Sequence, residues 1–377
     1  MLLLLFIARM LNNSIVSLHI YGLSQSSSVF SISKMRFKCN YCQFSKLFSP
    51  AFRLSDRYGF EFNKGIIKNV ITSGIVAERV FSSPQTISCS NNIYVSSSLF
   101  INCKNLNSPG GAILCICNFS DVSINKCTFE KCSSFGTFNS GSRSNAGGGA
   151  IALHCLNANI TNSVFSYCYC VGIGPSFYIG CPIRQNASIG MVSLFCTGSN
   201  HSSEGNTWCI DRASASLSCI NNTSPNVFYH SGGHVGYSSE YSVVRFMLVK
   251  NSAAVHIYGN SLSTNSSTGV NDHCSFVNLT AYIAIFEFYQ RFHSYSNCVF
   301  SQLTGNLISK NHSSFEFVSC IFDTDYASEP ATYLSCVFTD SVITDLPMYC
   351  VPDRLIEPSK TSKPNRFYYL FHVFLLP

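Results

Sequence analysis

Charged side chains are scarce in this sequence: Asp, Glu, Lys and Arg make up 11% of its 377 residues. In globular proteins about a quarter of the residues are charged. Disordered chains combine low hydrophobicity with high charge, whereas this chain is 46% hydrophobic. The same scarcity of Glu and Lys, together with the lack of a 3.5-residue apolar spacing, excludes a coiled coil.

Long apolar runs are also missing. No stretch of 18 apolar residues occurs, so the sequence predicts no full-length transmembrane helix. The tail Phe367–Pro377 is apolar but only 11 residues long, behind the polar stretch Pro358–Arg366. It is compatible with a truncated anchor, an interfacial tail or a strand that closes the end of the fold, so membrane association stays open.

Positive charge is concentrated at one end of the chain. Residues 1–80 hold 10 Lys and Arg against 3 Asp and Glu, whereas residues 81–350 hold 10 against 13. A nucleic-acid surface needs a basic stripe with interleaved aromatic residues in the folded middle, and none is present. We therefore expect no nucleic-acid partner.

The cysteine content points to an oxidising compartment. The chain has 20 Cys, several times ordinary cytosolic usage, spread too widely to lock a mini-protein. Residues 1–20 are compatible with a signal peptide, because the run Met1–Ile7 is apolar, although no basic residue precedes it. A buried first strand and an imperfect gene start are the alternatives. We expect a secreted or cell-surface protein.

A short pattern recurs along the chain. Aligned on one Phe, it has an apolar residue five positions earlier, Cys or Ser two positions earlier, and often Cys or Leu three positions later. The instances are Val95–Ser98–Phe100–Cys103, Ile124–Cys127–Phe129–Cys132, Ile160–Ser163–Phe165–Cys168, Cys274–Phe276–Leu279, Tyr295–Cys298–Phe300–Leu303, Phe317–Cys320–Phe322 and Tyr333–Cys336–Phe338, with an early copy at Cys42–Phe44–Leu47. Such spacing is typical of solenoid repeats.

A second motif, Gly-Gly-Ala-Ile, precedes two of these copies. It consists of Gly110, Gly111, Ala112 and Ile113, and again of Gly148, Gly149, Ala150 and Ile151. Alternating Cys-x-Phe segments between Asn, Ser and Gly turns favour short strands, which bury their faces only by stacking on neighbouring repeats.

The predicted fold class is all-β, a right-handed parallel β-helix with short terminal capping segments. Residues 21–80 would form the N-terminal cap or first coils, 81–350 the β-helix, and 351–377 a polar linker and the apolar tail. Phe100, Phe129 and Phe165 would then form an internal aromatic stack, and Ile113 and Ile151 an aliphatic ladder.

Cysteines in adjacent coils would be close neighbours. Strands about 4.8 Å apart bring in-register residues such as Cys103, Cys132 and Cys168 within the range of disulfide Cα separations, so they either bond or stack as small buried side chains. Cys39 and Cys42 form one isolated Cys-x-x-Cys pair, and a structural zinc site needs two further ligands. We expect neither a metal nor a cofactor.

The Gly-Gly-Ala-Ile segments and the Phe-x-x-Cys segments at Phe100, Phe129 and Phe165 resemble the polymorphic outer-membrane protein family. They are closer still to Cys-rich surface proteins of that type in parasitic protists. Cys replaces the Asn of the bacterial Phe-x-x-Asn motif. The resemblance is strong over residues 95–170, weaker over 271–340 and poor over 171–270. It implies a surface-displayed β-helix with adhesive or antigenic roles.

Parallel β-helices also include polysaccharide lyases and glycosidases, which use paired carboxylates. If this chain were such an enzyme, Asp323, Asp325 and Asp340 would be its catalytic candidates, since they follow aligned Phe residues; solvated turns are the simpler interpretation. The segment Gly232–Gly236 contains a His but lacks the acidic pair of such enzymes. Ser133–Gly147 is rich in Ser, Gly and Asn and predicts a loop that leaves one coil.

The favoured function is a non-catalytic interaction or adhesion module that binds a host or cell-surface protein or a glycan. A β-helix carbohydrate-active enzyme is the second hypothesis. The third is a truncated family copy without independent function.

Overall fold

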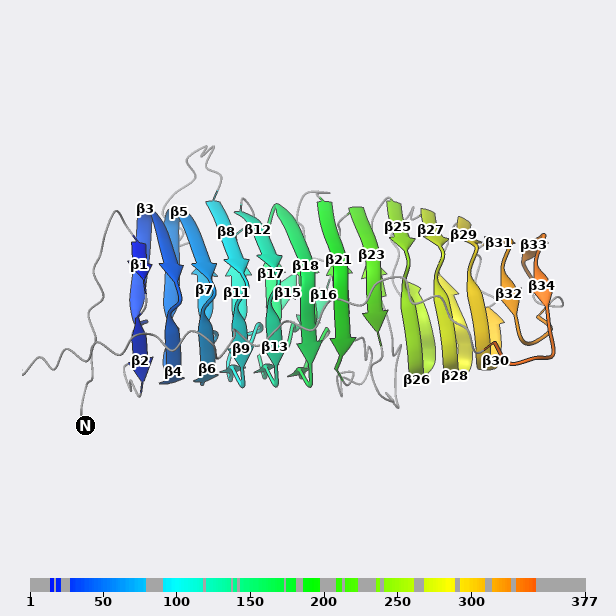
Figure 1. The fold of residues 1–377 in the computed structure, drawn as a ribbon, viewed down its shortest axis with the longest axis horizontal. Coiled ribbons are helices and arrows are strands. Elements are labelled where there is room, and N and C mark those ends of the chain that lie inside the picture. Colours follow the sequence, from blue (N-terminus) through cyan, green and yellow to red (C-terminus); the bar gives the residue numbers. More distant parts are fainter. Residues whose placement is uncertain are drawn as a thin grey trace, which may run out of the picture.

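The computed structural model describes residues 14–16, 18–21, 28–78, 91–117, 120–136, 138–140, 143–172, 174–180, 186–196, 208–211, 214–222, 235–237, 241–260, 268–288, 292–308, 314–326 and 330–343. Every regular element in these ranges is a β-strand (Figure 1). The expected all-β class is confirmed. Within these ranges no helix has the length and apolarity needed to cross a bilayer. The segments 1–13 and 344–377, with the whole apolar run Met1–Ile7 and the whole C-terminal tail, lie outside the described residues.

The strands of residues 14–101 are β1 (Ser14–Val16), β2 (His19–Tyr21), β3 (Phe30–Asn40), β4 (Gln43–Leu47), β5 (Phe52–Asn63), β6 (Ile66–Val70), β7 (Ile75–Glu78), β8 (Asn91–Ser96) and β9 (Leu99–Ile101). Those of residues 104–222 are β10 (Lys104–Asn105), β11 (Ile113–Ile116), β12 (Ser120–Asn125), β13 (Thr128–Glu130), β14 (Ser133–Ser134), β15 (Phe138–Ser140), β16 (Arg143–Ala146), β17 (Ile151–His154), β18 (Asn157–Ser166), β19 (Tyr169–Cys170), β20 (Phe177–Gly180), β21 (Asn186–Phe195), β22 (Trp208–Asp211) and β23 (Ser214–Asn222). Those of residues 235–338 are β24 (Val235–Tyr237), β25 (Tyr241–Arg245), β26 (Leu248–Asn260), β27 (Thr268–Asp272), β28 (Ser275–Phe288), β29 (Phe292–Ser296), β30 (Val299–Ile308), β31 (Ser314–Val318), β32 (Ile321–Phe322), β33 (Thr332–Leu334) and β34 (Val337–Phe338).

Parallel pairing joins most of these strands into three ladders. Ladder A contains the first half of β3, then β5, β7, β11, β17, β20, β22 and β24. Ladder B contains β1, β3, β5, β8, β12, β18, β21, β23, β25, β27, β29, β31 and β33. Ladder C contains β2, β4, β6, β9, β13, β18, β21, β23, β26, β28, β30, β32 and β34.

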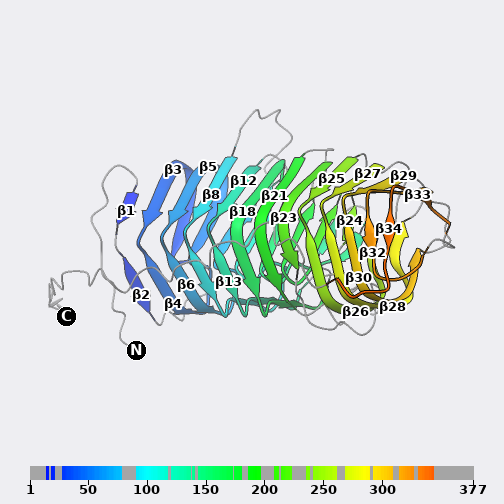
Figure 2. The same cartoon turned by 45° about the vertical axis from the view of Figure 1, so that its right-hand side comes forward.

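The ladders follow the chain in order. Paired residues of ladder B are between 16 positions apart, as in Glu316↔Thr332, and 36 positions apart, as in Ser123↔Asn159. In Figure 1 the strands succeed one another along the longest axis from blue to orange. Figure 2 shows that strands of ladders B and C meet at a corner, for example where β3 leads into β4. The strands within residues 30–78 belong to the same ladders as the later ones.

Side chains alternate between the interior and the surface, as strand geometry requires. In β12, Ser120, Val122 and Ile124 are buried, while the residues between them are partly exposed. One apolar cluster extends from Ile15 to Tyr326 through the interior of the stack. Because each strand buries one face against this shared core, no single repeat is self-sufficient.

Aromatic rings stack along ladder C. Phe129 lies between Phe100 and Phe165, with ring centroids 4.9 Å and 4.8 Å away and interplanar angles of 9° and 11°. Near the other end Phe300 stacks between Phe276 at 5.4 Å and Phe322 at 4.5 Å. The expected stack of the first three rings is present, and Ile113 pairs with Ile151 in ladder A as expected.

The predicted surface loop contains regular structure. Ser133–Ser134 forms β14, which pairs in parallel with β10 and β19. The following strands β15 and β16 form an antiparallel hairpin, with Phe138 opposite Ala146 and Ser140 opposite Arg143. Among the strand pairs of the described residues, β15–β16 is antiparallel and the others are parallel.

Candidate functional site

The corner between ladders B and C has the same backbone conformation in repeat after repeat. One non-glycine residue at this corner has a φ between 48° and 55°, in the left-handed region that L-residues rarely adopt. These residues are Tyr41, Lys64, Ser97, Lys126, Asn162, Phe246, His273, Asn297, Ser319 and Ser335. A sharp corner at one fixed place explains why the repeated motif keeps its spacing on both sides.

The residue after each corner points inward and is most often Cys or Ser. The Cys127 thiol donates to the Asn125 carbonyl at 3.4 Å and to the Val95 carbonyl of the preceding repeat at 3.6 Å. The Ser163 hydroxyl likewise donates to the Thr161 carbonyl at 2.8 Å. A short side chain with one donor thus satisfies the carbonyl before the turn. This explains why either Cys or Ser can occupy this position.

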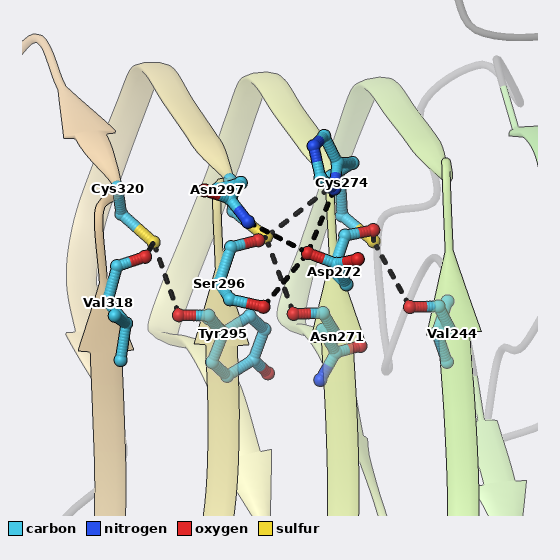
Figure 3. A network of polar contacts seen from close by, with 11 residues as sticks. Val244, Asn271, Asp272, Cys274, Tyr295, Ser296, Asn297, Val318 and Cys320 are labelled. Carbon is cyan, nitrogen blue, oxygen red and sulfur yellow. Dashed lines mark hydrogen bonds and ion pairs between the residues drawn. The ribbon is translucent and has the colours of Figure 1, made fainter.

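Eight cysteines form two stacked columns. In the first, Cys132 interacts with Cys103 and Cys168, and Cys168 with Cys196. In the second, Cys298 interacts with Cys274 and Cys320, and Cys320 with Cys336. Figure 3 shows two members of the second column, whose sulfurs face the carbonyls of Val244, at 3.8 Å from Cys274, and Tyr295, at 3.3 Å from Cys320.

Burial makes Cys127 and two of the column thiols, Cys103 and Cys298, poor nucleophiles. It raises the pKa of Cys127 to about 12, and it raises the pKa values of Cys103 and Cys298 well above those of ordinary thiols. Only the thiolate reacts with electrophiles and binds metals. Cys103, Cys132, Cys298 and Cys320 are free thiols in this structure, so here the stacking alternative is the observed one.

Outside the second column the corner carries a polar network. The Asp272 carboxylate accepts hydrogen bonds from Ser296 at 2.9 Å and Asn297 at 3.1 Å (Figure 3). Burial on its own would raise the pKa of Asp272, but these bonds and one from His273 outweigh it, so the pKa is lowered. The carboxylate therefore ties two repeats together on the surface and remains ionised.

Both glycines of Gly-Gly-Ala-Ile are required by the backbone. Gly110 and Gly148 have φ of +71° and +73°, and Gly110 N donates to the Gly148 carbonyl at 2.8 Å. A Cβ on Gly149 would lie 2.3 Å from the Pro175 carbonyl oxygen. The motif therefore marks a close approach between neighbouring repeats, and it has a structural role.

The three candidate carboxylates do not form an aligned pair. Because Phe322 pairs with Phe338, Asp323 lies opposite Thr339 and Asp340 is one position further along. The Asp323 carboxylate accepts hydrogen bonds from the Ser301 hydroxyl at 2.8 Å and the Gln302 amide at 2.7 Å. It thereby caps the bend at Gln302 in the preceding repeat, where φ is 54°. Asp325 and Asp340 are exposed.

The described residues contain no group of three or more Cys, His, Asp and Glu side chains that could hold a metal ion. Cys39 and Cys42 are both buried, and the Cys42 thiol donates to the Asn40 carbonyl at 3.2 Å. His234 of the glycine-flanked segment lies outside the described residues.

The outer face of ladder B carries aligned polar side chains over several repeats. One row runs Lys38, Glu61, Tyr94, Ser123, Asn159, and the next runs Asn40, Asn63, Ser96, Asn125, Thr161. Hydrogen bonds cross from repeat to repeat within the second row: Ser96 donates to Asn63 Oδ1 at 3.0 Å, and Thr161 to Asn125 Oδ1 at 3.2 Å. Every repeat thus adds one line of outward side chains to a common face.

A groove opens on this face over β3, β5 and β8. Its volume is about 370 Å³, and it is lined by Arg36, Asn40, Glu61, Phe62, Asn63, Tyr94 and Ser96. The residues lie far apart in the sequence, in the segment 21–80 predicted above as the N-terminal cap or first coils and in the segment 81–350 predicted as the β-helix. None of them belongs to the repeated motif, so sequence reasoning missed the groove; only the inward Phe-based register could have placed them side by side.

Comparison with protein-family models, with curated proteins and with solved structures finds no match to this chain. The interpretation of the groove therefore depends on its own geometry and chemistry.

Proposed function

We propose that this chain is a right-handed parallel β-helix, displayed outside the cell, that works as a non-catalytic interaction or adhesion module. The fold proposal is supported by three parallel ladders that advance through the same sequence of repeats and share one core. Strands stacked in this way build a rigid surface with side chains in fixed rows.

The observation that carries the functional proposal is the outer face of ladder B with its groove. Partly exposed polar side chains recur there in register beside the exposed Tyr94, without the apolar enclosure of a cofactor pocket. Such a surface suits a partner that binds across several repeats, either a protein or a glycan on a host or cell surface. The resemblance to Cys-rich surface proteins with polymorphic outer-membrane repeats supports the same location.

The location is tested by antibodies against the segment Ser133–Gly147, which includes the hairpin β15–β16. We expect these antibodies to label intact cells that make the protein. Labelling that requires permeabilisation would place the epitope inside the cell and contradict surface display. An antibody against a known cytosolic protein serves as the control for membrane integrity.

Adhesion is tested with beads that carry the purified chain. We expect them to bind target cells, and soluble chain to compete with them. The absence of catalysis is tested on a panel of polysaccharides: no release of reducing ends is expected. Release that disappears in Asp325→Ala would instead establish a carbohydrate-active enzyme.

A further inference from the structure

We infer that the groove over β3, β5 and β8 binds an anionic oligosaccharide, that is, a sugar chain that carries carboxylate or sulfate groups. This inference rests on the proposed role as an interaction module and specifies the ligand class of one of its surfaces. Three properties of the groove lead to it: a held but unpaired guanidinium, an exposed aromatic ring beside amide donors, and strands whose backbone is already paired.

The guanidinium belongs to Arg36 on β3. A Cβ on the neighbouring Gly59 of β5 would lie 3.2 Å from Arg36 Cγ, so the glycine leaves room for the Arg36 stem to lie across the adjacent strand. The stem lies over Gly59 beside the groove, and the side chain remains exposed. Arginine in a fixed orientation binds carboxylate and sulfate-like oxyanions through two parallel hydrogen bonds.

Counting Lys38 beside the groove, the charged side chains here are two cations, Arg36 and Lys38, against one anion, Glu61, a balance of +1. Glu61 is 2.9 Å from the Lys38 ammonium, so its negative charge is already compensated. No carboxylate among the described residues forms an ion pair with Arg36. One uncompensated positive charge at a concave surface attracts an anionic ligand.

Polar and aromatic groups surround this charge. Tyr94 is 43% exposed and offers both a ring face and a hydroxyl. Because Asn63 Oδ1 accepts the Ser96 hydroxyl at 3.0 Å, the amide orientation is fixed and Nδ2 is left as a donor. A flat ring next to oriented amides suits a sugar, whose ring has an apolar face and a hydroxyl-bearing edge.

The backbone distinguishes a sugar from an extended peptide. An extended peptide gains much of its affinity by pairing with a free strand edge. The strands under the groove, β3, β5 and β8, already pair with one another in ladder B, so recognition there uses side chains alone. The strand spacing of about 4.8 Å is also close to the length of one pyranose unit in an extended chain, so successive sugars can meet successive repeats.

The test uses the full chain and four immobilised probes: a hyaluronan oligosaccharide, dextran sulfate, neutral dextran and poly-glutamate. We expect binding to one or both anionic glycans and little to neutral dextran. Arg36→Gln should weaken binding about tenfold or more, since a charge-assisted hydrogen bond contributes about 1.5–3 kcal/mol. Tyr94→Ala should also weaken it. Binding to hyaluronan assigns a carboxylate, and binding to dextran sulfate alone assigns a sulfate ester.

The matched control variants are Lys131→Gln and Tyr167→Ala. Both residues are exposed and directly follow the ladder C strands β13 and β18 of later repeats, away from the groove. Equal losses in these controls, equal binding to neutral dextran, or no binding to either anionic glycan would overturn the inference. Stronger binding to poly-glutamate, abolished by Arg36→Gln, would replace the sugar with an acidic peptide. Cell labelling and bead adhesion are measured without these probes, so failure of the glycan assay leaves the proposed function separately testable.

Discussion

Phe100 and Phe129 lie face to face in neighbouring strands of ladder C, with their ring centroids 4.9 Å apart and their planes inclined by 9°. Phe129 is fully buried and makes an equivalent contact with Phe165 on its other side. Each ring therefore contributes to two interfaces between repeats, and its removal affects both.

Replacing Phe129 with Ala should destabilise the fold by roughly 3–5 kcal/mol, because the cavity has stacked neighbours on both sides that cannot close it without moving their strands. Chemical denaturation measures the change. Phe135→Ala is the control, since Phe135 is 46% exposed and should cost little. A loss below about 1 kcal/mol for Phe129→Ala would show that the ring is not in the core.

Gly149→Ala should be more harmful than Gly190→Ala. An added Cβ at Gly149 meets the backbone carbonyls of Pro175 and Tyr169 at 2.3 Å and 2.4 Å, whereas at Gly190 the nearest atom is the mobile Ser218 hydroxyl at 3.2 Å. We expect Gly149→Ala to lower the free energy of unfolding by about 1–3 kcal/mol. Gly190→Ala should change it by no more than about 1 kcal/mol. Thermal unfolding of both variants decides the matter; equal melting temperatures would contradict the close approach seen here.

Stability should depend on pH through His293. This side chain is 3% exposed, and burial lowers its pKa from 6.5 to about 4. Between these two values the unfolded chain binds a proton that the folded chain does not, so stability is full above pH 6.5 and decreases as the pH falls toward 4. The total loss is about 3 kcal/mol.

Unfolding free energies of the parent and of His293→Phe, measured between pH 4 and pH 7, test the effect of His293. Between pH 7 and pH 4 the variant should lose about 3 kcal/mol less unfolding free energy than the parent. An identical pH profile for both proteins would show that His293 is not a buried neutral imidazole.

The buried thiols should react slowly in the folded protein. At pH 8 almost none of Cys127 is thiolate, because burial raises its pKa to about 12. Cys336, at the end of the second column, is only partly buried. Mass spectrometry after brief alkylation should therefore find Cys336 modified before Cys127, and both modified after unfolding. Rapid modification of Cys127 in folded protein would mean that the core around this residue opens.

The inward-facing positions of each repeat could be predicted from the sequence because they are occupied by a few residue types. A Phe two positions after Cys or Ser, as in Cys127–Phe129, identifies the corner and the stack together. Earlier repeats were harder to recognise. Ile67 pairs with Phe100 and occupies the same row, but Gly65 and Ile67 share neither the Cys nor the Phe of the motif.

A third relative of Gly-Gly-Ala-Ile was missed for a similar reason. Gly174 has a φ of +78°, and its carbonyl accepts a hydrogen bond from Gly149 N, as the Gly148 carbonyl does from Gly110 N. Pro175 and Ser176 follow Gly174 in place of the second Gly and the Ala. The backbone geometry recurs although the residues differ, because more than one sequence can adopt this conformation.

The outward half was beyond prediction because its constraints are weak. Arg36, Glu61 and Tyr94 face solvent, so no shared residue type aligns them; the groove exists only once the inward residues have fixed the register. Asp323 illustrates the opposite case. An acidic residue after an aligned Phe suggested chemistry, but its carboxylate is engaged by Ser301 and Gln302 of the preceding repeat.

The short distance along the chain between paired strands has a consequence for biosynthesis. At about 5–20 residues per second, the ribosome adds the 36 residues that separate Ser123 from Asn159 in a few seconds, and the 16 that separate Glu316 from Thr332 sooner still. When a strand leaves the exit tunnel, the preceding strand of its ladder has therefore already been synthesised and can pair with it. The nascent chain can assemble from its beginning, one layer at a time, without waiting for distant segments to be translated.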